Sequence, residues 1–212
     1  MRVKAIMMPF SKLACISVEN TVEEAMKIID EQGLLSLPVV DGQQFVGVLS
    51  KQFLFEEFFR NYTGTREEFA QRKVMEFMKT RIETIGENTR IEEAAAMFIT
   101  SKVRFIPITN EQNKLLGIVT QQAVFKEYQK IFGNKHNSMA IYTYDIRGVL
   151  GKICELIAKE GGDICNMMVI PTDVMDLAEI FLRVEAPDFE GVVRALERHG
   201  YDVRDVKYND QK

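Results

Sequence analysis

The chain has 212 residues, of which 46% are hydrophobic and 27% are charged, and this balance excludes a disordered chain. Its formal net charge of −4 disfavours a broad electrostatic surface for nucleic acid. No run of about eighteen apolar residues is present, and the apolar stretch near the start is too short for a signal peptide. We therefore expect a soluble, cytoplasmic protein that contacts neither nucleic acid nor membrane.

The first half of the chain contains an internal repeat, in which residues 23–50 align with residues 92–120. Each copy opens with a Thr-x-x-Glu pattern, at Thr21 and at Thr89, and this pattern predicts a capping box at a helix start. Apolar residues then recur at helical spacing. Gly33 is suited to end the first helix in the left-handed conformation.

Each predicted helix is followed by a hairpin and a closing helix. The strands LSLPVV and FVGVLS of the first copy correspond to RFIPIT and KLLGIVT of the second. A unit of about sixty residues buries little core by itself, so we expect the two copies to pack against each other. The predicted boundaries are residues 1–59 for the first repeat, 60–73 for a charged linker with helical character and 74–131 for the second repeat.

The segment 138–208 does not match the repeat and predicts the order strand–helix–strand–strand–helix–strand. Asp188 is the predicted cap of the second helix. This βαββαβ order indicates a split β-α-β sandwich of the α/β (α+β) class, with helices on one face of the sheet. Association of two chains as a homodimer is one way to cover the other face.

The repeat resembles the CBS domain, and two copies in tandem resemble a Bateman module. The shared features are Glu-Ala at the helix start, the strand end L-P-V-V-D, and glycine followed by two aliphatic residues and a hydroxyl residue. Residues 138–208 resemble a ferredoxin-like ACT domain through D-x-x-G-V-L at Asp145 to Leu150 and Gly-Gly-Asp-Ile at Gly161 to Ile164. A CBS pair followed by an ACT domain resembles the acetoin utilization protein B family.

The resemblance implies a ligand-binding regulatory protein that acts as a homodimer on a partner protein. CBS pairs typically bind adenosine nucleotides of the AMP, ATP or S-adenosylmethionine type between the repeats, as regulatory ligands and not as cofactors. ACT domains typically bind amino acids, often at a dimer interface. The candidate residues of the CBS clefts are Gly47, Ser50, Lys79, Thr80, Arg81, Arg104, Pro107, Gly117 and Thr120. Those of the ACT site are Asp145, Arg147, Gly148, Val149, Leu150, Asp163 and Ile164.

General chemistry supports a ligand site at the two hydroxyls. A glycine ahead of Ser50 or Thr120 lets a ligand approach the backbone, and free N–H groups at a helix start favour a phosphate. In nucleotide-binding CBS repeats an acidic residue three positions later bonds the ribose, but Phe53 and Ala123 stand there. Losing one such bond costs roughly 1.5–3 kcal/mol. Nucleotide binding is therefore weak, or the preceding glutamine supplies the contact, or the clefts serve another ligand.

Each candidate also has a simpler interpretation. The two hydroxyls are suited to act as plain helix N-caps, and so is Asp145. Arg104 and the cluster 79–81 are also compatible with solvated surface charge. Arg147 stands where the family often has proline, and its guanidinium could pair with a carboxylate.

No pattern of catalytic or metal-binding residues is present in the sequence. We find no nucleophile motif, phosphate-binding loop or dinucleotide fingerprint, and we predict that the protein is not an enzyme. The chain has three cysteines and two histidines without a C-x-x-C pair, so we expect no metal site and interpret the cysteines as small buried residues. The main hypothesis is a ligand-sensing regulator. The alternatives are a dimeric scaffold without ligand and an accessory subunit of a small ketone or acid (acetoin-type) pathway.

Overall fold

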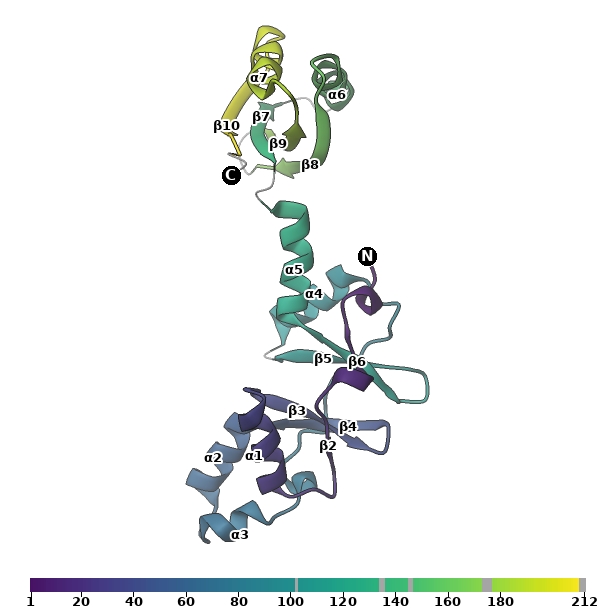
Figure 1. Ribbon diagram of the computed structural model, residues 1–212, viewed down its shortest axis with the longest axis vertical. Helices are drawn as coiled ribbons and strands as arrows, with labels where there is room; N and C mark the ends of the chain where they lie inside the picture. Colours follow the sequence, from purple (N-terminus) through teal and green to yellow (C-terminus); the bar gives the residue numbers. More distant parts are fainter. Residues whose placement is uncertain (102, 134–135, 145–146, 173–176, 210–212) are drawn as a thin grey trace. The chain divides into compact units, whose positions relative to one another are not determined.

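The computed structural model describes residues 1–101, 103–133, 136–144, 147–172 and 177–209 (Figure 1). They form two compact units, of which the first ends at Tyr128 and the second begins at Gln129. The first unit contains η1 (Val3–Ala5), β1 (Met8–Pro9), η2 (Phe10–Lys12), β2 (Ile16–Ser17), α1 (Val22–Glu31), β3 (Ser36–Asp41), β4 (Gln44–Ser50), α2 (Lys51–Asn61), α3 (Arg66–Ala70), η3 (Val74–Glu76), α4 (Ile91–Thr100), β5 (Phe105–Thr109) and β6 (Leu115–Thr120). Helix α5 (Gln121–Phe132) contains the boundary, and the second unit continues with β7 (Asn137–Thr143), α6 (Val149–Lys159), β8 (Asp163–Pro171), β9 (Ala178–Glu185), α7 (Phe189–Arg198) and β10 (Asp202–Lys207).

Helix α1 begins with the predicted capping box. The Thr21 hydroxyl accepts a hydrogen bond from the Glu24 amide at 3.2 Å, and the Glu24 carboxylate accepts one from the Thr21 amide at 2.8 Å. This backbone hydrogen bond lowers the pKa of Glu24. The helix ends just before Gly33, whose φ of +62° confirms the predicted left-handed turn.

The corresponding prediction for the second copy is wrong. The N-cap residue of α4 is Arg90, and its side chain makes no capping hydrogen bond. The carbonyl of Thr89 instead accepts a hydrogen bond from the amide of Val3 at 2.9 Å. The start of α4 is thus held by the N-terminal segment of the chain, which no local pattern around Thr89 indicates.

The predicted hairpins are present, and they join the two repeats. Strands β3 and β4 pair antiparallel, as do β5 and β6. The amide of Phe45 donates to the carbonyl of Asn113 at 3.0 Å, and the amide of Leu115 donates to the carbonyl of Gln43 at 2.9 Å. Val40, Phe45 and Leu115 share a small core between the hairpins. The two copies therefore pack against each other, as expected.

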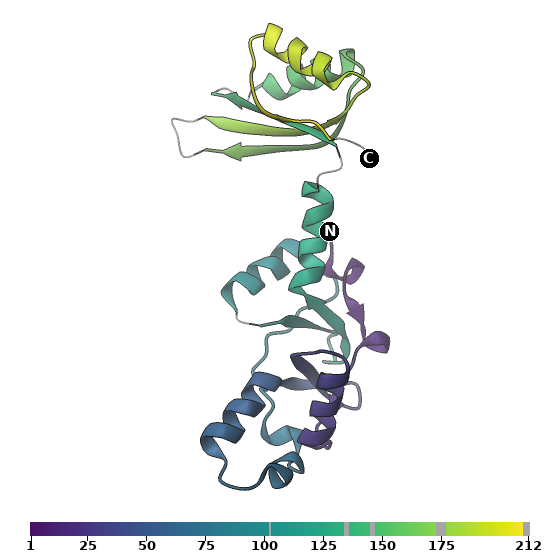
Figure 2. The ribbon, with the colours of Figure 1, turned by 60° about the vertical axis from the view of Figure 1, so that its left-hand side comes forward.

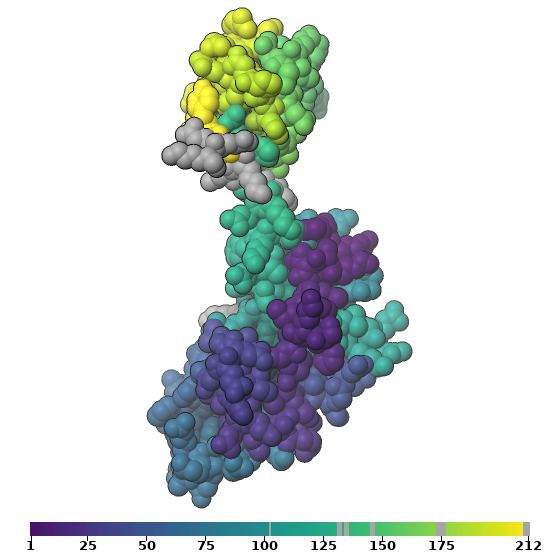
Figure 3. Space-filling view, viewed as in Figure 1, coloured from purple at the N-terminus to yellow at the C-terminus, as the bar shows by residue number. Residues whose placement is uncertain are grey.

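The two repeats also exchange segments. Strand β1 pairs antiparallel with β6 of the second repeat, and Val3 is fully buried in the core of that repeat. In return, Val74 is fully buried in the core of the first repeat, and Lys79 pairs with Val48 of β4. The purple atoms at the start of the chain lie against teal atoms of the second repeat in Figure 3. Each core thus contains a segment from the range predicted for the other repeat.

The second unit has the predicted βαββαβ order. Its sheet has the strand order β10-β7-β9-β8 with antiparallel pairing throughout. Helices α6 and α7 cover one face (Figure 2), and their apolar stripes enclose fully buried residues such as Ile141, Ile153 and Leu182. Asp188 caps α7 as predicted, since its carboxylate accepts from the amide of Gly191 at 2.8 Å. None of the helices in the described part of the chain combines the length and apolar character needed to cross a bilayer.

Each exchanged segment pairs with its strand, β4 or β6, beside a glycine, and we call these two places the crossings. A Cβ atom added at Gly47 would lie 2.5 Å from the carbonyl oxygen of Lys79, and one at Gly117 would lie 2.3 Å from that of Met8. We expect Gly117→Ala to destabilise the first unit by roughly 1–3 kcal/mol, because the backbone of β1 must move away. Urea denaturation measures this change.

Gly86→Ala is the matched control, because a Cβ there meets no atom within 4 Å and its φ is not positive. Equal stability of the Gly117 and Gly86 variants would show that β1 can shift without cost.

The buried N-terminal segment gives a second prediction. Val3→Asp places an unpaired carboxylate in the core of the second repeat and should cost on the order of 3 kcal/mol. Hydrogen exchange should show lost protection in α4, whose start the segment holds. Lys4→Asp, at the exposed neighbouring position, should leave protection unchanged. Equal exchange in both variants would contradict the packing of this segment.

Candidate functional site

The first candidate site lies at the start of α2. The Ser50 hydroxyl ends β4 and caps the helix by accepting from the amide of Phe53 at 3.5 Å. Phe53 is half-buried against the core of the first repeat, and the ammonium nitrogen of Lys79 lies 5.4 Å from its ring centroid. The position that is acidic in the family pattern therefore holds an aromatic ring under a cation.

The neighbours of this site are the residues that follow Lys79 and the side chain of Gln52. Thr80 and Arg81 follow Lys79 and are exposed beside it in sequence. The predicted boundaries place this cluster in the second repeat, but Lys79 pairs with Val48 of β4 in the first repeat. The side-chain Nε2 of Gln52 donates to the carboxylate of Glu56 at 2.9 Å, so this side chain is engaged along α2.

The second candidate site lies at the start of α5. The Thr120 hydroxyl accepts from the amide of Ala123 at 3.1 Å, which repeats the Ser50 cap. Thr120 pairs with Phe105, and the exposed Arg104 immediately precedes that residue. The crossing segment here is Met8–Pro9, which carries no charge. The second site therefore has a methyl group in place of the Phe53 ring and an arginine from the strand side.

Three of the predicted cleft residues have a structural role in backbone packing and hydrogen bonding. Gly47 and Gly117 permit a close approach, as predicted, but the approaching group is the chain's own backbone and not a ligand. Pro107 is buried in β5, and its carbonyl accepts from the amide of Ile85 at 3.1 Å. These residues position the strand ends on which the two hydroxyls lie.

The two helix starts share features that suit an anion. Each presents a capping hydroxyl and the positive end of a helix of eleven or twelve residues. Lys79 contributes a cation at the first site, and Arg104 does so beside the second. Both hydroxyls are confirmed as helix caps, which leaves their remaining lone pair and proton for a ligand.

The residues predicted for the ACT site divide between two ends of the second unit. Asp145 lies outside the described residues. Gly148, with φ of +77°, is the N-cap residue of α6 and follows the exposed Arg147. Val149 and Leu150 form the first turn of α6 and pack half-buried on the core. These four described residues lie together in sequence at the start of α6.

Asp163 and Ile164 lie at the other end of the sheet. Asp163 pairs with Glu185 at the end of β9, whereas the last residue of β7, Thr143, pairs with Ala178 at its start. Seven residues along β9 correspond to about 23 Å. Within one chain, Asp163 and Ile164 therefore do not form one site with the start of α6.

The structure reveals an apolar cavity that the sequence analysis did not identify. It has a volume of about 350 Å³ and lies among α1, α2 and α3. Phe55, Phe58, Phe59 and Phe69 contribute to its lining, and Phe59 is 76% exposed. Phe125, at the position of the second copy that matches Phe55, is 70% exposed. The run FLFEEFF at residues 53–59 was the available signal, because it is too aromatic for a single buried stripe.

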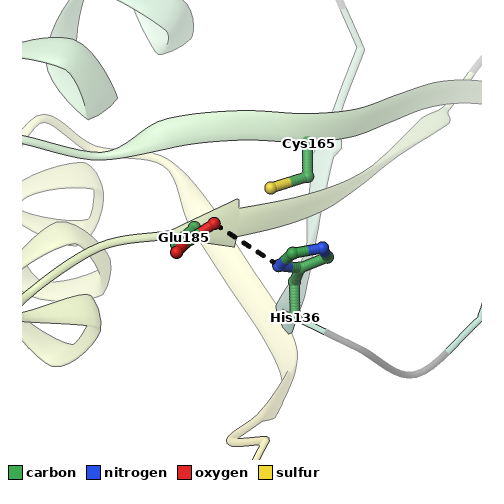
Figure 4. A group of neighbouring side chains, drawn as sticks. All are labelled: His136, Cys165 and Glu185. Atoms are coloured by element: carbon green, nitrogen blue, oxygen red, sulfur yellow. Dashed lines mark ion pairs between the residues drawn. The ribbon is translucent and has the colours of Figure 1, made fainter.

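A second group that was missed consists of His136, Cys165 and Glu185 (Figure 4). One ligand atom from each lies within 4.8 Å of the others. No sequence spacing indicates the group, because the three residues belong to different parts of the second unit. Cys165 is exposed, so the prediction that the cysteines are buried is wrong for this one. Cys15 fits it better, since burial raises its pKa to about 11.

Comparisons with known proteins agree with the repeat. The CBS domain family model matches residues 3–52 and 74–130, together just over half of the chain. Inosine-5'-monophosphate dehydrogenase from Korarchaeum cryptofilum is 28% identical over 113 residues, covering 52% of this chain and 21% of that protein. The chain thus spans about a fifth of that relative's length. Cyclic di-AMP receptor B from Bacillus subtilis is 26% identical over 125 residues, covering 58% of this chain and 84% of the relative.

Solved structures show the same fold for the first unit. A CBS domain-containing protein from Bacillus anthracis has a TM-score of 0.56 at 25% identity, covering 61% of this chain and 94% of that one. CBSX2 in complex with AMP has a TM-score of 0.54 at 24% identity, covering 61% and 97%. The two matched ranges cover just over half of the chain, so this chain belongs to the CBS-domain family and contains a tandem CBS pair.

Proposed function

We propose that the CBS pair binds an adenine nucleotide as a regulatory ligand. The observation that carries this proposal is the repeated helix cap, in which Ser50 and Thr120 each present a hydroxyl at a helix start beside a basic residue. A nucleotide offers phosphate for the helix start and the cation, and hydroxyls and a base for neighbouring groups. The relatives support the same ligand class, since one is named a cyclic di-AMP receptor and another was solved with AMP.

The start of α5 is the better of the two sites for this ligand. At the start of α2, the Phe53 ring and the Lys79 ammonium already contact each other, and a ligand would have to separate them. At the start of α5, Ala123 adds only a methyl group, and Arg104 is exposed. We therefore assign the nucleotide to the site of Thr120, with its phosphate toward Arg104.

The second unit is proposed to be an ACT domain that binds an amino acid at the start of α6. The amides of Val149 and Leu150 would hold the carboxylate, because they belong to the first turn of that helix. Arg147 is suited to pair with an acidic group of the same ligand. In this proposal the chain has no catalytic role and transmits ligand binding to a partner protein, as a member of the acetoin utilization protein B group.

We further propose that two chains associate through the exposed aromatic residues of the first unit. Phe55 and Phe125 occupy matching positions on α2 and α5 and are 46% and 70% exposed. Phe59 extends the apolar surface of α2 and stacks with Phe55 at a ring-centroid distance of 6.3 Å. Large exposed aromatic residues at matching places are typical of a surface that a symmetric partner covers.

The nucleotide proposal is tested with the full chain by thermal shift and calorimetry. AMP, ATP, S-adenosylmethionine and cyclic di-AMP are the probes, with the twenty amino acids as a separate set. A nucleotide at about 100 times its Kd should stabilise the first unit by roughly 2.7 kcal/mol. Calorimetry should then show weaker binding to Thr120→Val, because the hydroxyl that meets the ligand is lost.

The chain offers matched controls for that variant. Ser50→Val removes the equivalent cap from the start of α2 and should leave the affinity unchanged, and Thr120→Ser should retain binding. Ala123→Asp adds the missing carboxylate and should tighten nucleotide binding roughly ten- to a hundred-fold. Stabilisation by amino acids alone would reject the nucleotide and favour the second unit as the sensor. No stabilisation by any probe would favour the dimeric scaffold.

The assembly proposal predicts a change of molar mass. Wild-type protein should have twice the mass of one chain in light scattering, and Phe59→Asp combined with Phe125→Asp should reduce it to that of a single chain. Tyr144→Asp, which replaces a 71% exposed aromatic residue of the second unit, is the control and should leave the dimer intact. A dimer that survives the double substitution would place the interface elsewhere.

A further inference from the structure

Three side chains with metal-binding atoms converge at one end of the sheet in the second unit. The imidazole of His136, the thiol of Cys165 and the carboxylate of Glu185 each offer one atom within 4.8 Å of the other two. The Nδ1 atom of His136 lies 3.8 Å from the Glu185 carboxylate, and Figure 4 shows the three side chains turned toward one another. As a surface ion pair alone, His136 and Glu185 would add little to the free energy of unfolding, roughly 0–1 kcal/mol.

The sheet topology explains why these residues meet. His136 immediately precedes β7, Glu185 is the last residue of β9, and Cys165 lies near the start of β8. Strand β9 runs antiparallel between β7 and β8, so its end lies beside the starts of both neighbours. Three distant parts of the sequence are therefore brought to one edge by main-chain hydrogen bonds and not by a flexible loop.

An irregularity in β8 determines the direction of the thiol. Ile164 pairs with Val184 and Asn166 pairs with Arg183, so Cys165 is the extra residue of a β-bulge. A bulge changes the direction in which a side chain points and is common next to functional sites. Cys165 is exposed, and its sulfur lies 3.8 Å from the carbonyl oxygen of Asp163.

The surroundings carry negative charge and are open to solvent. His136 and Glu185 line a hollow of about 540 Å³ whose lining also includes the carboxylate residue Asp163. No lysine or arginine is among the described residues that line this hollow. A cation entering it meets acidic groups without a competing positive side chain.

The three donors match what Zn²⁺ accepts. Zinc is bound by thiolate, imidazole and carboxylate at about 2.0–2.3 Å, which places ligand atoms of a tetrahedral site about 3.3–3.8 Å apart. The present separations of up to 4.8 Å need to contract by only about 1 Å. The exposed side chains of Cys165 and Glu185 can make this adjustment by rotation around the half-buried His136. Three protein ligands leave the fourth position open for water or a small anion.

We propose that His136, Cys165 and Glu185 form a Zn²⁺ site with three protein ligands and an open fourth position. The bound ion would join the starts of β7 and β8 to the end of β9. It would thereby fix the residue that directly precedes β7. The site is independent of the nucleotide proposal, since its residues all belong to the unit that begins at Gln129.

Titration of the full chain with Zn²⁺ and with Co²⁺ tests the proposal. Calorimetry should show one Zn²⁺ per chain, and Co²⁺ should produce a thiolate-to-metal charge-transfer band together with tetrahedral ligand-field bands. Cys165→Ser and His136→Gln should weaken Zn²⁺ binding by more than the roughly 10- to 100-fold that loss of an outer partner of a ligand costs. Glu185→Gln should weaken it in the same direction.

The chain supplies matched controls for the thiol ligand and for the imidazole ligand. Cys154→Ser and His199→Gln remove the same chemical groups elsewhere in the second unit and should leave the affinity and the Co²⁺ spectrum unchanged. Circular dichroism of each variant confirms folding, and in wild type, Zn²⁺ should protect Cys165 from a thiol reagent. A Co²⁺ spectrum without a thiolate band, or equal Zn²⁺ affinity of Cys165→Ser and wild type, would overturn the site.

Discussion

The first unit depends on two crossings, at each of which a segment from the range of one repeat pairs with a strand of the other repeat. Lys79 pairs with Val48 of β4, and Met8 pairs with Ile118 of β6. At each place the glycine before the paired strand residue lies so close that a Cβ atom there would meet the carbonyl oxygen of Lys79 or Met8. These crossings carry the exchanged segments to the cores in which Val3 and Val74 are buried. Gly47 and Gly117 each precede a capped helix by only a few residues. The same constraint therefore fixes the strand ends that present Ser50 and Thr120.

The crossings also make the two halves of the pair chemically unequal. The segment that crosses β4 contains a lysine, whose ammonium lies over Phe53, whereas the segment that crosses β6 contains methionine and proline. Two sites with the same capping pattern therefore differ in charge and in the size of the side chain three positions after the hydroxyl. A nearly symmetric fold can in this way carry different side chains at two matching helix starts.

Local patterns were sufficient to predict most of the elements but not their partners. The Thr21 capping box, the turn at Gly33, the hairpins and the order of the second unit all follow from signals within a few residues. The segment exchange was not predictable from such signals, because the repeat is contiguous in sequence. The group of His136, Cys165 and Glu185 could not be predicted either, because it depends on strand order and on a bulge in β8. The start of α4 was mispredicted because Val3, and not a local side chain, holds it.

The exchanged segments have a consequence for how such a chain can arise by gene duplication. A single copy would lack both the segment that pairs with its second hairpin strand and the valine that this segment buries in its core. Two separate copies could complete each other by swapping these segments, as domain-swapped dimers do. Fusion into one gene makes that exchange intramolecular, at a high effective concentration set by the connecting residues 60–73. Loss of either copy would therefore remove a fully buried valine from the core of the other copy.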